Sequence, residues 1–98
     1  MPEVRVLGGL RARVGGARIE VRADGVRQLL GRLIEDRGPG LAAVFYAEPG
    51  GSPDALHEDL RVLVNGRSIA FLDGVDTPLS ESDTVTLHLA GARGTPGG

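Results

Sequence analysis

The sequence predicts an α+β fold in which one main helix packs on one face of a mixed sheet of four to five strands. Three observations support this prediction. Two short alternating segments lie near the N-terminus, one long apolar stripe has helical spacing, and further alternating segments follow in the second half. The 98 residues are enough for one domain with a core of its own.

Two short strands are expected in the first quarter of the chain. Residues 4–7 and 18–22 alternate apolar and polar side chains, and glycine pairs at 8–9 and 15–16 punctuate the stretch between them. We expect the two segments to form an N-terminal hairpin.

The main helix is predicted to begin after Asp24, a favourable N-cap residue. Its apolar stripe repeats at i, i+3, i+4, i+7 and i+8 and consists of Val26, Leu29, Leu30, Leu33 and Ile34. The Arg-Gly-Pro sequence at 37–39 ends it. Gly31 inside the helix costs about 1 kcal/mol relative to alanine, and we expect close contact between helix and sheet to offset that cost.

The second half of the chain contains most of the predicted sheet. Residues 41–46 are compatible with a helical turn or a strand. Residues 60–64 predict a strand, Asn65-Gly66 a type I′ turn, 67–69 a returning strand and 84–89 the last strand. The order strand, strand, helix, turn region and three strands is that of a β-grasp fold, in which the first and last strands are parallel central neighbours.

Composition excludes several functions. All 11 basic Lys and Arg residues are arginines, so a P-loop lysine and a lysine Schiff base are both impossible. With no cysteine, disulfides, iron–sulfur clusters and a thiol nucleophile are excluded. The arginines are scattered without interleaved aromatic residues, which argues against nucleic-acid binding. No apolar run is long enough to span a membrane, and we expect a soluble cytoplasmic protein.

The chain ends in Gly97-Gly98. We divide it into a β-grasp domain at 1–89 and a flexible C-terminal tail at 90–98 that ends in Gly-Gly. An unbranched, exposed tail can enter a narrow active site on another protein. There its terminal carboxylate can be activated as an acyl adenylate.

Several segments together match a known family pattern. They are Val-Leu-Val-Asn-Gly-Arg at 62–67, Ile69, Phe-Leu-Asp-Gly-Val-Asp-Thr-Pro-Leu at 71–79, Asp-Thr-Val at 83–85 and the terminal Gly97-Gly98. In these segments the chain resembles the MoaD/ThiS family of ubiquitin-like sulfur carriers. The resemblance implies that an ATP-dependent adenylating enzyme activates Gly98, that a sulfur donor converts it to a thiocarboxylate, and that an acceptor synthase takes the sulfur.

The same resemblance implies that the chain is a carrier and not an enzyme, and that it holds no cofactor. It leaves the pathway open among molybdopterin, thiamin, cysteine, tRNA thiolation and secondary metabolism. It also leaves the function of the tail undecided. Gly91-Ala92 stands where many members have their diglycine, and residues 93–98 extend beyond that position. Either the tail is a long functional one or its final glycines are partly accidental.

Four further residues are candidates for partner binding. Leu7, Leu63 and His88 alternate with core positions and are predicted on the sheet face opposite the helix, as a docking patch or as incidental exposed surface. Arg93 either helps an activating enzyme hold the tail or is a solvated charge. His57 and His88 lack companions at ligand spacing, so no metal site is predicted.

Two other functions remain open besides sulfur transfer. The chain could be a β-grasp interaction module with an inert tail, or a ubiquitin-like protein modifier. An enzyme with its own active site has little support, because no nucleophile and base stand in a recognisable pattern.

Overall fold

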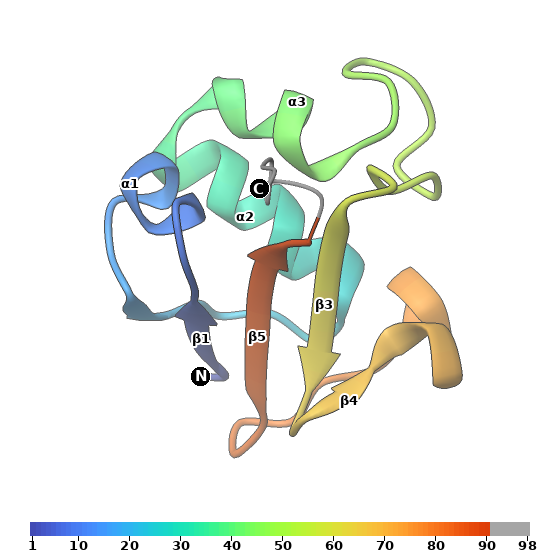
Figure 1. The fold of residues 1–98 in the computed structure, drawn as a ribbon. Helices are drawn as coiled ribbons and strands as arrows, with labels where there is room; N and C mark the ends of the chain where they lie inside the picture. The colour runs from blue at the N-terminus through green and yellow to red at the C-terminus, as the bar shows by residue number, and fades with distance from the viewer. Residues whose placement is uncertain (91–98) are drawn as a thin grey trace.

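Five strands form one mixed sheet in the computed structural model, which describes residues 1–90. They are β1 (Glu3–Val6), β2 (Arg18–Glu20), β3 (Leu60–Val64), β4 (Arg67–Ser68) and β5 (Thr84–Leu89). Their order across the sheet is β2-β1-β5-β3-β4 (Figure 1). The central pair β1 and β5 is parallel, and the other neighbouring pairs are antiparallel. The predicted β-grasp arrangement, with parallel first and last strands at its centre, is confirmed.

Strand register decides which side chains enter the core. Val6 of β1 and Val62 of β3 are both paired with Leu87 of β5, so the three side chains share one face of the sheet. All three are at most 2% exposed. Because side chains alternate along a strand, the residues between these positions point to the opposite, open face.

The main helix α2 (Val26–Arg37) covers the buried face of the sheet (Figure 1). The predicted stripe is confirmed, since Val26, Leu29, Leu30 and Leu33 are buried and Ile34 packs against the core. The expected role of Gly31 is wrong. A Cβ atom built on Gly31 meets nothing within 4 Å, so no close approach of the sheet requires glycine there.

The predicted N-cap Asp24 is also wrong. Gly25 caps α2 without any side-chain hydrogen bond. Main-chain bonds fix the start of the helix instead: Val26 N–H donates to the Thr77 carbonyl at 3.1 Å, and Leu79 N–H donates to the Asp24 carbonyl at 2.9 Å. Residues 77–79, which run alongside the start of α2, therefore replace a side-chain cap with main-chain hydrogen bonds.

The connection between β1 and β2 contains a helix that the sequence analysis did not predict. The two strands pair antiparallel as expected, with Val4 opposite Ile19. Between them lies α1 (Leu10–Val14), which buries Leu10 and Val14 and ends at Gly15, whose φ is 92°. β1 is as long as predicted but begins one residue earlier, and β2 ends at Glu20, two residues before its predicted end.

The ambiguous segment after α2 is helical. It forms the short helices η1 (Pro39–Leu41) and α3 (Ala42–Phe45), and Phe45 is fully buried. The predicted Asn65-Gly66 turn between β3 and β4 is confirmed, because both residues have positive φ, 53° and 85°. Two more short helices follow β4, η2 (Ile69–Phe71) and η3 (Gly74–Asp76).

Candidate functional site

The open face of the sheet carries the three predicted docking residues that the structure describes. Leu7 follows β1 directly, is 49% exposed and donates its N–H to the Leu87 carbonyl at 3.0 Å. Leu63 of β3 is paired with Thr86, and His88 of β5 is paired with Arg61. Leu63 and His88 are half-buried. Leu63 lies between the buried Val62 and Val64, and His88 follows the buried Leu87, so alternation places both on the face away from α2.

Leu7 and His88 meet at the end of the sheet, and Leu63 does not join them. A hollow of about 370 Å³ at this end is lined by Leu7, Gly8, Gly9, Leu10, Arg13, His88 and Leu89. Leu63 lies further along the face, in the row of Thr86. The predicted patch therefore consists of a hollow around Leu7 and a separate apolar position at Leu63.

Arg13 is part of this hollow and was missed by the sequence analysis, because α1 was not predicted. The signal was present but short. Leu10 and Val14 stand four residues apart between two glycine pairs, a spacing that buries one side of a single helical turn. With these two side chains buried, Arg13 on the same helix remains exposed beside Leu7.

Guanidinium groups surround the apolar positions of the open face. Glu3 binds two of them, Arg18 at 3.0 Å and Arg5 at 3.6 Å. Arg61 lies on the same face opposite His88, and Arg13 borders the hollow. Arginine suits contacts with carboxylates, which it can bind through two parallel hydrogen bonds. The arrangement fits a partner surface that combines apolar and acidic side chains.

The C-terminal candidates lie outside the described residues. These are Arg93, Gly97 and Gly98. The described part of the chain ends just past β5, where Ala90 N–H donates to the Asp59 carbonyl at 2.7 Å. Leu89 lines the hollow that contains Leu7, so the sequence that continues after Ala90 starts beside that hollow.

His57, considered above as a metal ligand, and Asp83 have structural roles. His57 accepts a hydrogen bond through Nδ1 from the Asp59 N–H at 3.1 Å. Asp83 accepts from the Ser80 N–H and from the Asn65 side chain, and these two hydrogen bonds lower the pKa of Asp83. Within residues 1–90, no group of three or more His, Cys, Asp or Glu side chains is arranged to hold a metal ion.

A second charged cluster joins α2 to the loop before β3 and to η3. Arg27 donates to Asp76 Oδ1 at 2.9 Å and also contacts Asp54, and these hydrogen bonds, with that to Asp76 the larger, raise the pKa of Arg27. Burial raises the pKa of the nearby Tyr46, an effect that the charge of Arg27 opposes. None of the helices in the described part of the chain is long and apolar enough to cross a membrane.

No protein-family profile matches the sequence, and a search of curated proteins finds no significant match. Solved structures do match. Small archaeal modifier protein 1 from Methanosarcina acetivorans has a TM-score of 0.75 at 24% identity, over 89% of each chain. CysO of Amycolatopsis orientalis, solved as a BexX/CysO complex, has a TM-score of 0.74 at 24% identity, over 92% of this chain and 96% of that one.

A third match is the putative molybdopterin converting factor subunit 1 from Pyrococcus furiosus. Its TM-score is 0.62 at 23% identity, over 89% of this chain and 93% of that one. At these identities the likeness establishes the fold. The chain shares the β-grasp fold of these three structures, and the fold implied by the resemblance seen in the sequence is confirmed.

Proposed function

We propose that this protein is a sulfur carrier whose terminal Gly98 carboxylate is adenylated and then converted to a thiocarboxylate. The observation that carries the proposal is the pair Gly97-Gly98 at the end of a β-grasp domain. β5 is central in the sheet, so the tail starts from the firmly held core. The tail itself has no bulky side chain after Arg93, which lets its carboxylate enter a narrow site on a partner enzyme.

The chemistry belongs to the partners. In the first step a Gly98 carboxylate oxygen attacks the α-phosphorus of ATP, pyrophosphate leaves, and the carbonyl carbon gains AMP as a good leaving group. A sulfide-level nucleophile from a sulfur donor then attacks that carbon and expels AMP, which leaves the thiocarboxylate. An acceptor synthase takes the sulfur and regenerates the carboxylate. The chain is substrate and carrier throughout, and because ATP drives the first step we place it in the cytoplasm.

Docking on these partners would use the open sheet face. Leu7 and Leu63 offer apolar contacts, and His88 lies beside Leu7 near the end of β5. Arg93, in the tail, would meet an acidic group near the partner's active site. The complex of the similarly folded CysO with BexX supports the expectation that a carrier of this shape binds a partner enzyme.

A second function, protein modification, uses the same activated Gly98. It is favoured by the likeness to a small archaeal modifier protein. The amine of an acceptor lysine would then attack the activated carbonyl carbon in place of sulfide, and an amide would form. If the protein were only an interaction module with an inert tail, neither the thiocarboxylate nor the amide would form.

Intact-mass measurement tests the proposal. The protein is incubated with its cognate adenylating enzyme, ATP and a sulfide source. We expect a mass increase equal to the difference between one sulfur and one oxygen atom, and release of pyrophosphate. The matched control lacks only Gly97 and Gly98. Equal sulfur loading of the full-length and truncated chains would refute the proposal, as would a full-length chain that never releases pyrophosphate.

A further inference from the structure

Two arginines from different helices line one hollow where α1 meets the end of α2. This arginine hollow has a volume of about 220 Å³ and is lined by Arg13, Arg37, Gly38, Gly40 and Leu41. Arg13 belongs to the last turn of α1 and Arg37 to the last turn of α2. A Cβ atom built on Gly15, which ends α1, would lie 3.6 Å from Arg37 Nη1. The guanidinium group of Arg37 therefore reaches across to α1 (Figure 1).

Neither guanidinium group has a partner in the part of the chain that the structure describes. Within residues 1–90, the side chains of Arg13 and Arg37 form no ion pair and donate no hydrogen bond. No Asp or Glu among these residues lines the arginine hollow. A guanidinium group presents its N–H donors as a planar fork that matches a carboxylate. Two such forks are thus available at one place.

The helix ends explain why two cations are tolerated together. The last carbonyl groups of a helix carry partial negative charge, which favours a nearby cation by about 0.3–1 kcal/mol. Arg37 occupies this position on the 12-residue helix α2, and Arg13 does so on α1. This attraction stabilises the charges without using their N–H donors. The donors therefore remain available for an anion from outside the chain.

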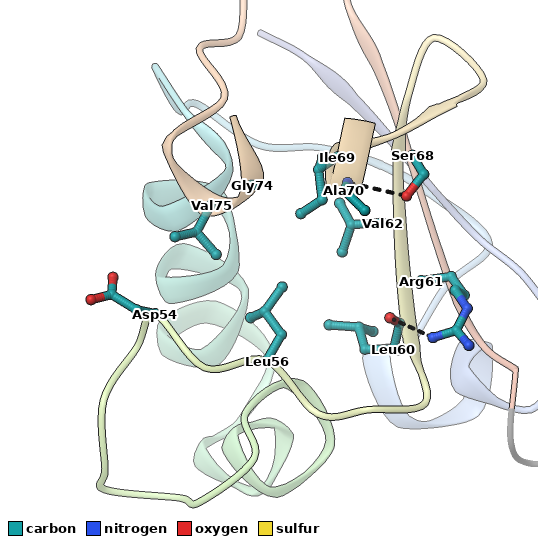
Figure 2. A pocket seen from close by; sticks show the side chains of 10 residues that line it. All are labelled: Asp54, Leu56, Leu60, Arg61, Val62, Ser68, Ile69, Ala70, Gly74 and Val75. Carbon is teal, nitrogen blue, oxygen red and sulfur yellow. Dashed lines mark hydrogen bonds between the residues drawn. The ribbon is translucent and has the colours of Figure 1, made fainter. Parts of the chain in front are cut away.

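The hollow beside β3 provides a contrast (Figure 2). It has a volume of about 350 Å³, and its lining carboxylate Asp54 contacts Arg27. Its lining arginine Arg61 donates through Nη1 to the carbonyls of Glu58 at 2.7 Å and Leu60 at 3.3 Å. The charged groups of that hollow are thus engaged within the chain, whereas the guanidinium groups of the arginine hollow are not.

The arginine hollow adjoins the apolar hollow around Leu7, because Arg13 lines both. Leu7 is 49% exposed and shares its hollow with Leu89. No Asp or Glu within residues 1–90 lines this hollow either. The two hollows therefore form one surface that is apolar at Leu7 and cationic at Arg37, and it runs from the open sheet face past α1 to the end of α2.

We propose that this combined surface binds an acidic segment of a partner protein. An apolar side chain of the segment enters the hollow around Leu7, and carboxylates beside it bind Arg13 and Arg37 through paired hydrogen bonds. The inference rests on the docking at the open face proposed above. It adds the charge of the partner segment and its direction, with the acidic end toward α2, and it does not depend on activation of Gly98.

Titration of the isotopically labelled full-length protein by nuclear magnetic resonance at low ionic strength tests the site. The probe is the capped peptide Gly-Leu-Gly-Glu-Glu-Gly, and its matched control carries Gln in place of both Glu residues. We expect saturable shifts of the Nε–H signals of Arg13 and Arg37 and of the Leu7 amide. The Glu peptide should bind at least about threefold more tightly, the size of an exposed ion pair. Absence of saturation below about 10 mM of the Glu peptide would overturn the proposal.

Variants of the two arginines separate a defined site from general attraction. Arg13→Gln and Arg37→Gln should each reduce the preference for the Glu peptide, and the double variant should abolish it, with the fold intact because both side chains are exposed. Arg32→Gln removes the same charge from the exposed side of α2 and is the matched control, which should keep the preference. Equal losses in Arg32→Gln and Arg37→Gln would replace the site by general charge attraction.

Two further comparisons distinguish other occupants and the proposed function. Tighter peptide binding after removal of residues 91–98 would make the chain's own carboxylate the occupant and overturn the proposal. A chain that loads sulfur on Gly98 but does not bind the Glu peptide would refute this inference alone. A chain that binds the Glu peptide with the expected preference but never loads sulfur would support this site and refute sulfur transfer.

Discussion

The side chain of Asn65 donates through Nδ2 to Asp83 Oδ1 at 2.9 Å and so joins two turns that are 18 residues apart. Asn65 Oδ1 also accepts the Thr84 N–H at 3.0 Å. The other oxygen of Asp83 accepts the Ser80 N–H at 2.8 Å. Together these bonds hold the β3–β4 turn against the start of β5, the strand from which the tail continues.

The Asp83 carboxylate should therefore stabilise the fold in a pH-dependent way. Its hydrogen bonds lower its pKa in the folded state. The stabilisation is fully present above the unfolded pKa of about 3.9 and is lost as pH falls through the lower folded value. We expect Asp83→Asn to reduce the free energy of unfolding most near neutral pH, with the deficit shrinking below about pH 4. Urea unfolding across this range measures it.

The matched control for this measurement is Asp36→Asn, on the exposed side of α2. It should show little deficit at any of these pH values. A deficit of Asp83→Asn that stays constant as pH falls would mean that side-chain size or turn geometry, and not the charge, accounts for the loss.

The face of α2 predicts unequal effects of neighbouring substitutions. Leu30 and Leu33 are at most 1% exposed, and Arg32 is exposed. Leu30→Ala or Leu33→Ala should lower the free energy of unfolding by roughly 2–5 kcal/mol. Arg32→Ala should change it by about 0.5 kcal/mol or less. Chemical denaturation of the three variants decides this, and similar losses at positions 30 and 32 would contradict the packing of the helix.

The elements that sequence predicts well are those with several agreeing signals. α2 has five apolar residues at helical spacing, and the β3–β4 turn has Asn65-Gly66 between two alternating segments. α1 was missed because five residues offer only the single pair Leu10 and Val14, and a short helix depends on tertiary burial more than on propensity. The cap at Asp24 failed for a related reason, since main-chain bonds from residues 77–79 replaced it.

The site was predictable only in part. Alternation placed Leu63 and His88 on the open face, because period-two patterns follow directly from strand geometry. Alternation alone does not predict which of these residues lie close together. Arg13 also lines the hollow, because it lies on the unpredicted helix α1. The exposure of Phe71 could not be predicted from the sequence either. An apolar run at 69–72 resembles a buried strand until the turn at Ser68 directs it out of the sheet.

Charge on the open face should weaken partner binding without unfolding the domain. Leu7→Glu places a carboxylate on a side chain that is 49% exposed, so its effect should fall on the desolvated contact with the partner. Leu63→Glu should act in the same direction. Titration calorimetry with the adenylating enzyme measures the loss, and circular dichroism checks the fold. Arg32→Glu, on the exposed side of α2, is the matched control and should bind normally.

Unfolding of Leu7→Glu would show that this residue supports the core. Unchanged affinity of both variants, with an intact fold, would move the docking surface away from the open face. Because Leu7 and Leu63 occupy separate positions on that face, a loss confined to Leu7→Glu would locate the contact at the hollow beside Arg13.

The absence of lysine makes protein modification directly testable. If the activated Gly98 is transferred to proteins, this sequence cannot build lysine-linked isopeptide chains on itself, because it contains no lysine. Trypsin cleaves after Arg93 and should leave Gly-Thr-Pro-Gly-Gly on acceptor lysines. Mass spectrometry of cell extracts detects this remnant, and cells with a chain lacking Gly97 and Gly98 should show none. Absence of the remnant where the free protein is abundant would confine Gly98 to sulfur transfer.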